Sequence, residues 1–349
     1  MADREPLPEN LDRYARQIRY VPIGVDGQQR LLAGKALVVG CGALGSVIAN
    51  TLARSGVGLL RIVDRDFLET NNLQRQVLFD EEDVAAGLPK AIAASNKLRR
   101  INSQVTVEPI VSDVDHANIM TLTEGIDVIV DGTDNFETRM LLNDLSLKLG
   151  LPWIYGGCLG AEGQTMTILP GETPCLRCLM SDTPPPGTTP TCDTAGILAP
   201  IVNIIASLEA NEAIKILSGN RAAVSRTLTV IDTWDNRVRQ LKLDALSRST
   251  CPACTGAEFP WLEGRRASHS AILCGRNAVQ ISPQSRAALS LDDLAEKLTS
   301  AGNVTANRYL VRLTVDDFQL TIFADGRAII SGTDDIAVAR TLYARYVGN

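Results

Sequence analysis

The chain has 349 residues, of which 45% are apolar, so it can form a sizeable core in two domains or in one large and one small domain. Its net charge of −6 argues against nucleic acid as the main partner, because phosphate contacts need clustered Lys and Arg. No apolar run has the length of a membrane span, and the polar start MADREPLPEN is unlike a secretory signal. We therefore expect a cytoplasmic protein without a membrane partner, whose eight cysteines serve as ligands or nucleophiles.

The first half of the chain alternates short apolar runs with segments of helical periodicity. Two short helices are expected within 11–33. Strands are expected at 35–40, 59–64, 105–110 and 126–131, with a fifth starting at Trp153, and helices at 43–55, 91–101 and 138–149. Such alternation predicts an α/β fold with a doubly wound, mostly parallel, Rossmann-like sheet.

A glycine-rich turn links the first strand to the helix at 43–55. It contains Gly40, Gly42 and Gly45, which leave room for a phosphate beside the helix N-terminus. Asp64 ends the next strand, where a carboxylate can accept from ribose hydroxyls. The pattern predicts a nucleotide site. A packing turn without ligand and a nicotinamide dehydrogenase remain open alternatives.

Polar residues after the later strands favour a triphosphate over a dinucleotide. These residues are Asn72, Arg75, Gln76, Lys90, Asp134 and Asn135. Arg75 and Lys90 can neutralise a leaving pyrophosphate, and Asp134 offers a hard oxygen ligand for Mg²⁺. Either cation alone would read as a solvated surface charge, whereas both together in this frame indicate a functional site.

Two CxxC pairs lie C-terminal to the glycine-rich turn, far along the sequence. Cys175, Cys178, Cys251 and Cys254 form the ligand set of a closed, structural zinc site. Two unrelated thiol pairs, or a redox CxxC, are the alternatives. Cys192 follows the Pro-rich segment 183–190, which predicts an exposed loop, and is a candidate nucleophile or sulfur acceptor. An unused loop thiol is the alternative for Cys192.

The remaining segments predict a core helix and a second unit. A long helix is expected at 199–217, buried in the core or in a subunit interface, followed by strands at 227–232 and 238–242. Residues 257–349 form a different unit, with strands expected at 271–281, 309–315, 319–323 and 327–331 and helices at 291–300 and 336–346. This order predicts a small α/β domain.

Eight motifs along the chain resemble one family. RYARQI, GCGALG, IVDRD, NNLQRQ, DGTDN, the two CxxC pairs and TCDTAG resemble the ThiF/MoeB family of ubiquitin-activating-type adenylyltransferases. The resemblance covers roughly residues 11–256 and is specific as a joint pattern. It implies an ATP-binding adenylyltransferase domain with the zinc site over 1–256, and leaves 257–349 as a domain of unknown role.

The resemblance implies an activity as well. Such enzymes use ATP to adenylate the C-terminal Gly-Gly carboxylate of a small β-grasp, ubiquitin-like sulfur carrier, and they release pyrophosphate. Thiocarboxylate formation or thioester transfer follows, for thiamine, molybdopterin or a related sulfur-transfer pathway. The ATP and Mg²⁺ residues of the family match Gly42, Asp64, Asn72, Arg75, Lys90 and Asp134.

Two further residues carry implications of the same resemblance. Arg16 matches an arginine that reaches into the partner subunit's ATP site, so a homodimer is implied. Cys192 matches a cysteine that captures the activated carrier in some members. For 257–349, carrier docking or support of a dimer is the hypothesis. Adenylation of a peptide, an NAD-dependent oxidoreductase and a non-catalytic scaffold remain alternatives for the whole chain.

Overall fold

The computed structural model describes residues 9–184, 190, 192–243, 246, 248–266, 270–273, 277–282 and 289–348. The chain divides into two compact units, one of 1–188 with 197–266 and the other of 189–196 with 267–349. The assignment of 1–256 as the adenylyltransferase domain and of 257–349 as a separate functional domain stays a prediction. Among the described helices, none combines the length and the apolar character that a membrane span requires.

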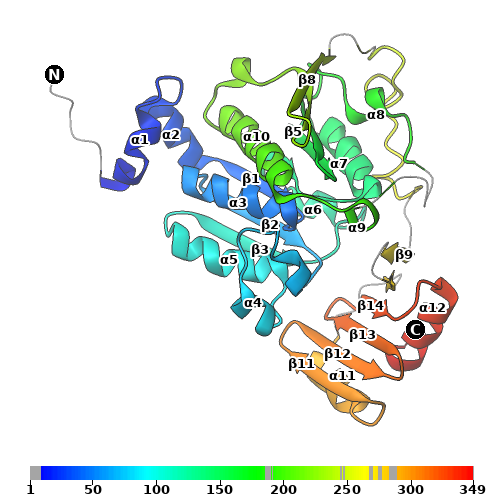
Figure 1. Cartoon of the computed structure of the whole chain (residues 1–349). Coiled ribbons are helices and arrows are strands. Elements are labelled where there is room, and N and C mark those ends of the chain that lie inside the picture. Colours follow the sequence, from blue (N-terminus) through cyan, green and yellow to red (C-terminus); the bar gives the residue numbers. More distant parts are fainter. Residues whose placement is uncertain are drawn as a thin grey trace. The chain divides into compact units, whose positions relative to one another are not determined.

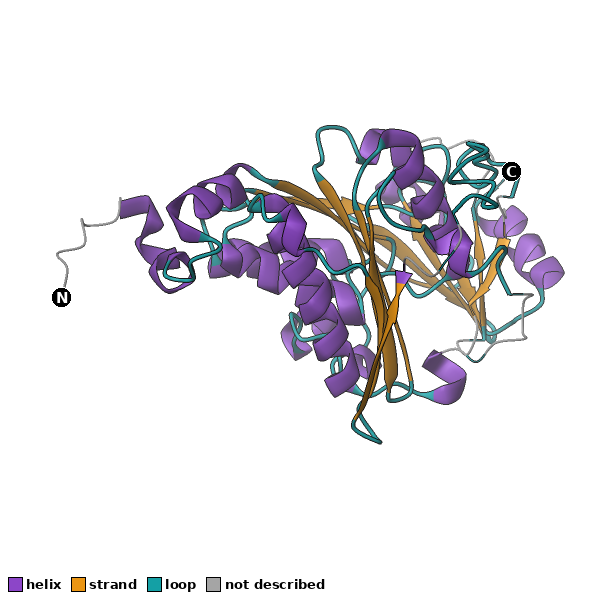
Figure 2. Ribbon diagram, turned by 90° about the horizontal axis from the view of Figure 1, so that it is seen from above, coloured by secondary structure: helices purple, strands orange, loops and turns teal. Residues whose placement is uncertain are grey.

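The first unit is built on one eight-stranded sheet (Figures 1 and 2). Its strands, in spatial order, are β3 (Thr106–Val111), β2 (Leu59–Asp64), β1 (Lys35–Val39), β4 (Val128–Asp131), β5 (Trp153–Leu159), β6 (Glu162–Ile168), β7 (Thr227–Asp232) and β8 (Arg237–Lys242). The ladders from β3 to β5 are parallel, and those from β5 to β8 are antiparallel. The predicted mostly parallel α/β sheet is confirmed.

Helices cover both faces of this sheet, as Figure 2 shows from above. The chain contains α1 (Ala15–Ile18), α2 (Gly24–Ala33), α3 (Ala43–Ser55), α4 (Glu81–Ala85), α5 (Lys90–Ile101), α6 (Ile119–Leu122), α7 (Phe136–Leu149), α8 (Leu176–Leu179) and α10 (Ala199–Leu217), with short 3₁₀ turns at Glu9–Tyr14, Thr70–Asn72 and Arg221–Ala223. Apolar residues of α3, α5 and α10 form the core on one face, and those of α6, α7 and α8 form it on the other. Two buried faces explain why β1 is an almost continuous apolar run.

Two strands, β6 and β11 (Asn303–Asn307), are not predicted by the sequence patterns. β6 carries Gly163, Thr165 and Thr167 on one face, where α10 packs so closely that a Cβ on Gly163 would lie 2.5 Å from Ile205. Small residues are required there, so the apolar alternation of a typical strand is absent. β11 is an edge strand with no fully buried residue.

The second unit contains a six-stranded antiparallel sheet in the order β11-β12-β13-β14-β10-β9. Its other elements are α9 (Cys192–Ala195), β9 (Ser270–Leu273), β10 (Ala278–Ile281), α11 (Leu291–Leu298), β12 (Leu310–Val315), β13 (Phe318–Phe323), β14 (Ala328–Ser331) and α12 (Ile336–Tyr346). The single strand expected over 271–281 is two paired strands, β9 and β10, and residues 274–276 between them lie outside the described residues. Most of the expected loop over 183–190 also lies outside them.

A carboxylic acid is enclosed between α10 and the sheet of the first unit. Glu209 is 0% exposed, and a Cβ on Gly156 of β5 would lie 1.9 Å from its Oε1. Neither of its carboxyl oxygens has a hydrogen-bond partner among the described residues. Burial raises the pKa of Glu209 well above its usual range, the nearby carboxylate of Asp131 adds to the rise, and Arg139 opposes it. We therefore expect Glu209 to be neutral in the folded protein.

A neutral Glu209 makes stability depend on pH. The unfolded chain ionises this residue above about pH 4.3, while the folded chain keeps its proton, so its contribution to stability falls as pH rises by up to about 1.4 kcal/mol per pH unit. Glu209→Gln removes this loss. In urea unfolding, the free energy of unfolding of the variant should therefore increase relative to that of the unsubstituted protein between pH 5 and pH 8. Glu82→Gln, at an exposed position, is the control. A stability difference for Glu209→Gln that stays constant over this pH range would contradict a neutral Glu209.

Candidate nucleotide site

The site is built on three backbones that meet at the carboxyl ends of β1 and β4. Gly40 has a φ of +83°, and a Cβ there would lie 2.6 Å from the carbonyl oxygen of Gly132. A Cβ on Gly45 would lie 1.9 Å from the Gly40 carbonyl oxygen. Both positions therefore require glycine. The contact places the first turn of α3 directly over the exit of β1, where an anion can meet the helix N-terminus.

Asp64 ties the end of β2 to this turn. Its Oδ2 accepts a hydrogen bond of 2.6 Å from the backbone N–H of Cys41, and its Oδ1 accepts one of 2.7 Å from that of Asp66. Each oxygen keeps a second lone pair for a ribose hydroxyl. Cys41 is fully buried, and burial raises the pKa of its thiol well above the usual range, so it is a neutral packing residue.

A buried cation stands beside this carboxylate. Lys90 begins α5, is 3% exposed, and its Nζ lies 3.1 Å from Oδ2 of Asp66. Burial raises the pKa of Asp64, and the charge of Lys90 opposes that rise. Nη1 of Arg65 lies 3.3 Å from Oδ1 of Asp113, which is in the segment after β3. The carboxyl ends of β2 and β3 thus carry two cations among several carboxylates.

The segment after β2 brings three more predicted residues to the same edge. Asn72 is 1% exposed, and its Oδ1 accepts from the backbone N–H of Glu69 at 3.2 Å. Gln76 is 3% exposed, and its Nε2 lies 3.8 Å from the Cβ position of Gly42. Arg75 is half-buried and donates to the carbonyl oxygen of Asn71 at 2.9 Å. Gln76 therefore faces the glycine turn directly.

Asp134 and Asn135 follow β4. Asp134 is exposed. Asn135 is the N-cap of α7, where its Oδ1 accepts from the backbone N–H of Thr138 at 2.9 Å. Because parallel strands end at one edge of the sheet, Asp134 shares that edge with Gly40 and Asp64. An exposed carboxylate at this edge can hold a hard cation.

Arg16 lies at the other end of the sheet. It is exposed on α1, and its neighbour Gln17 donates to the carbonyl oxygen of Ser55 at 3.0 Å, where α3 ends. α3 runs from the carboxyl end of β1 back to the amino end of β2, so one chain does not bring Arg16 to Asp134. Cys192 is half-buried and begins α9, which belongs to the second unit, so its predicted role stays a prediction.

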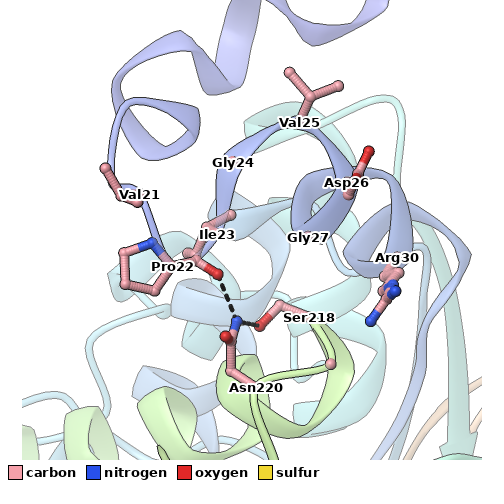
Figure 3. Close-up of a pocket in the computed structure, with 11 residues that line it drawn as sticks. Val21, Pro22, Ile23, Gly24, Val25, Asp26, Gly27, Arg30, Ser218 and Asn220 are labelled. Atoms are coloured by element: carbon pink, nitrogen blue, oxygen red, sulfur yellow. Dashed lines mark hydrogen bonds between the residues drawn. The ribbon is translucent and has the colours of Figure 1, made fainter.

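Figure 3 shows a pocket that is separate from the glycine turn. It lies between the turn from α1 to α2 and the end of α10, where Asn220 donates to the carbonyl oxygen of Pro22 at 2.8 Å. Since α2 leads into the amino end of β1, this pocket is at the end of the sheet away from Asp64 and Asp134. It is not part of the nucleotide site.

The four cysteines of the two CxxC pairs meet in space. Their Sγ atoms all lie within 4.8 Å of one another, with distances of 3.9 Å for Cys175–Cys178, 3.7 Å for Cys175–Cys251 and 3.6 Å for Cys178–Cys254. A tetrahedral zinc with Zn–S bonds of about 2.3 Å requires sulfur separations of about 3.8 Å. The cluster therefore fits a four-thiolate metal site, and the alternative of two unrelated thiol pairs is excluded.

Sequence reasoning missed two residues that shape the site. In the sequence Gly132 is only one position of the DGTDN motif, although the Gly40 carbonyl oxygen lies 2.4 Å from its Cβ position. Arg139 reads as a surface charge on a helix, yet it is 7% exposed. A signal for Glu209 was present, because it follows Ile201 and Ile205 at four-residue spacing on the buried face of α10.

Known proteins are similar to this chain in sequence and in fold. A sulfur carrier protein ThiS adenylyltransferase of Bacillus subtilis is 43% identical over 337 residues, which cover 96% of this chain and 99% of that protein. A SAMP-activating enzyme E1 of Haloferax volcanii is 40% identical over 244 residues, covering 70% of this chain and 88% of that protein. The structure of Escherichia coli MccB with MccA-N7isoASN has a TM-score of 0.62 at 24% identity, covering 71% and 77% of the two chains, which shows a shared fold.

The family assignment rests on the extent of these matches. The model of the ThiF family matches residues 14–253, which include the glycine turn, the polar segments after β2 and β4 and all but the last cysteine of the cluster. The relative from Bacillus subtilis also extends over the second unit. The chain belongs to the ThiF family.

Proposed function

We propose that this adenylyltransferase transfers AMP from ATP to the C-terminal glycine carboxylate of a small ubiquitin-like sulfur carrier and releases pyrophosphate. The supporting observation is the 43% identity over 96% of the chain to an enzyme that is named for the carrier ThiS. The SAMP-activating relative covers only 70% of this chain. We therefore favour a ThiS-like carrier, with thiocarboxylate formation as the downstream step in the cytoplasm.

The chemistry needs no proton acceptor. A carrier carboxylate oxygen attacks the α-phosphorus, the bond to the bridging oxygen breaks, and that oxygen leaves with pyrophosphate. Lys90 and Arg75 would stabilise the developing negative charge, and Asp64 would orient the ribose. Asp134 would hold a Mg²⁺ ion, which supplies charge neutralisation at the phosphates. Catalysis then consists of positioning and electrostatic stabilisation, which fits a chain with two histidines.

Loss of Asp134 tests this assignment. We expect Asp134→Ala to lower carrier-dependent ATP–pyrophosphate exchange by about a hundredfold or more, because a preorganised charge at the transferring group is lost. Glu137→Ala, at an exposed position three residues later, should keep the rate. Full exchange activity in Asp134→Ala would refute a role for this carboxylate.

We also propose that two copies form a homodimer in which each contributes Arg16 to the other's site. Arg16 stands far from Asp134 within one chain, so it can act there only from a second copy. Tyr20 and Val21 beside it are 64% and 89% exposed, and Ile204 on α10 is 40% exposed. Exposed apolar groups on these elements are typical of an interface.

A mixing experiment tests the shared site. Arg16→Ala and Asp134→Ala should each be inactive alone. Random exchange of subunits should restore about a quarter of the exchange activity, because half of the dimers are mixed and each holds one intact site. A mixture that stays inactive, although native mass spectrometry shows mixed dimers, would contradict this arrangement.

The cysteine cluster supports a structural zinc in our proposal. Cys175 directly precedes α8 and Cys178 lies within it, whereas Cys251 and Cys254 follow β8. One ion would therefore join segments that are distant in sequence. Four thiolates leave no open position on the metal for substrate. Zinc would stabilise the fold of the first unit and take no part in adenylation.

Metal analysis tests the zinc. The purified protein should contain one zinc per chain, and Cys178→Ser should lose it and unfold at a lower temperature, since binding energy of a structural metal is folding energy. Cys158→Ser is the control, because Cys158 is half-buried outside the cluster. A metal-free protein that is as stable as the zinc-loaded one would contradict a structural role.

A further inference from the structure

Arg139 is a buried arginine at the edge of the nucleotide site. It belongs to the beginning of α7 and is 7% exposed. Its guanidinium lies 5.5 Å from the ring centre of Phe136 and 5.3 Å from that of Tyr155. Cation–π attraction to two aromatic rings thus favours this position of the guanidinium.

The guanidinium joins the exits of two neighbouring strands. Its Nη2 donates to the carbonyl oxygen of Thr133 at 2.7 Å, after β4, and to that of Gly156 at 3.0 Å, in β5. Its Nε lies 3.6 Å from Oδ2 of Asp131. One nitrogen of the planar guanidinium thus serves both carbonyl oxygens, while its charge lies beside the carboxylate of Asp131 as an ion pair without a hydrogen bond. A lysine ammonium lacks this planar geometry.

Each polar group of Thr133 forms a hydrogen bond in this arrangement. Oδ1 of Asp131 accepts from its backbone N–H at 2.9 Å and from its hydroxyl at 2.7 Å, and Arg139 donates to its carbonyl. The next residue is Asp134, and after it comes Asn135, which caps α7. Asp134 therefore lies between Thr133 and Asn135, whose side chains are both held by hydrogen bonds, while its own carboxylate is exposed.

β5 has two glycines where Arg139 and Glu209 approach the sheet. A Cβ on Gly157 would lie 3.2 Å from Nη2 of Arg139, and one on Gly156 would lie 1.9 Å from Oε1 of Glu209. Successive residues of a strand face opposite sides of a sheet, so the arginine and the acid approach from α7 and from α10. With Glu209 neutral, Arg139 and Asp131 balance each other's charge in this buried region.

We propose that Arg139 is a positioning residue that holds Asp134 in the geometry required for divalent-cation binding, through its hydrogen bond to the carbonyl of Thr133. This inference rests on the proposed function, since it takes Asp134 as the cation ligand. Arg139 touches neither the cation nor the nucleotide in this account. Its contribution is the rigidity of the loop that presents the carboxylate.

Mn²⁺ binding measured by electron paramagnetic resonance, with a non-hydrolysable ATP analogue present, tests the inference without turnover. Arg139→Lys keeps the positive charge but loses the planar guanidinium, so the Mn²⁺ dissociation constant should rise by about 10- to 100-fold, the range for partners of metal ligands. Nucleotide affinity without metal should stay unchanged. Carrier-dependent exchange should then require more Mg²⁺ for half-saturation.

Arg61→Lys is a matched control. Arg61 also pairs with one carboxylate, Glu108 at 2.8 Å, and donates to two carbonyls, those of Leu122 and Glu124, at 2.9 and 3.1 Å. It lies within β2, away from the strand exits. Its replacement should lower the melting temperature to a similar extent and leave Mn²⁺ affinity unchanged. Equal weakening of Mn²⁺ binding in both variants would overturn the inference.

Thr133→Val provides a second variant if Arg139→Lys folds poorly. It removes one hydrogen bond to Asp131, leaves Arg139 in place, and should weaken Mn²⁺ binding by a smaller factor. Mn²⁺ affinity equal to that of the unsubstituted protein in every folded variant would overturn the positioning role alone. An unsubstituted protein that binds no Mn²⁺ would contradict both this inference and the assignment of Asp134.

Discussion

Close backbone contact at Gly40, Gly45 and Gly132 is the constraint on which the nucleotide site depends. The Cβ position of Gly45 lies 1.9 Å from the Gly40 carbonyl oxygen, and that of Gly132 lies 2.4 Å from the same atom. No side chain fits between β1, β4 and α3 at this point. The contact fixes the direction of α3 and brings the exits of three strands to one edge, so that Asp64, Lys90 and Asp134 can act on one ligand.

The carboxyl groups near the site differ in how deeply they are buried. Asp134, the proposed cation ligand, is exposed, whereas Asp131, three residues earlier, is 0% exposed, and burial raises the pKa of Asp131 to about 6. Asp131 accepts a hydrogen bond from Thr133 and pairs with Arg139, and Glu209, whose pKa is raised by burial, lies on the opposite side of the sheet. Buried polar groups of this kind cost stability unless they are paired, so their presence beside the site indicates a need for rigidity there.

The sequence predicts much of the fold because strand and helix periodicities are strong in the first half of the chain. The glycine turn and the cysteine spacing likewise indicate chemistry directly, since few residue types can serve in those positions. β6 was missed because close packing of α10 replaces apolar residues by Gly163 and two threonines. Arg139 was missed because a charged residue on a helix is usually solvated, and only the three-dimensional path of β5 shows what buries it. Arg16 is distant from the site in one chain, so its proposed role needs a second copy.

Carrier-dependent ATP–pyrophosphate exchange is the most direct test of the central claim. The purified protein would be assayed with each β-grasp carrier of its own genome, and with each carrier truncated by its last glycine. We expect exchange with one full-length carrier, of ThiS type, and none with its truncated form. Exchange that does not depend on a carrier, or no exchange with any carrier despite measurable ATP binding, would contradict adenylation of a carrier C-terminus.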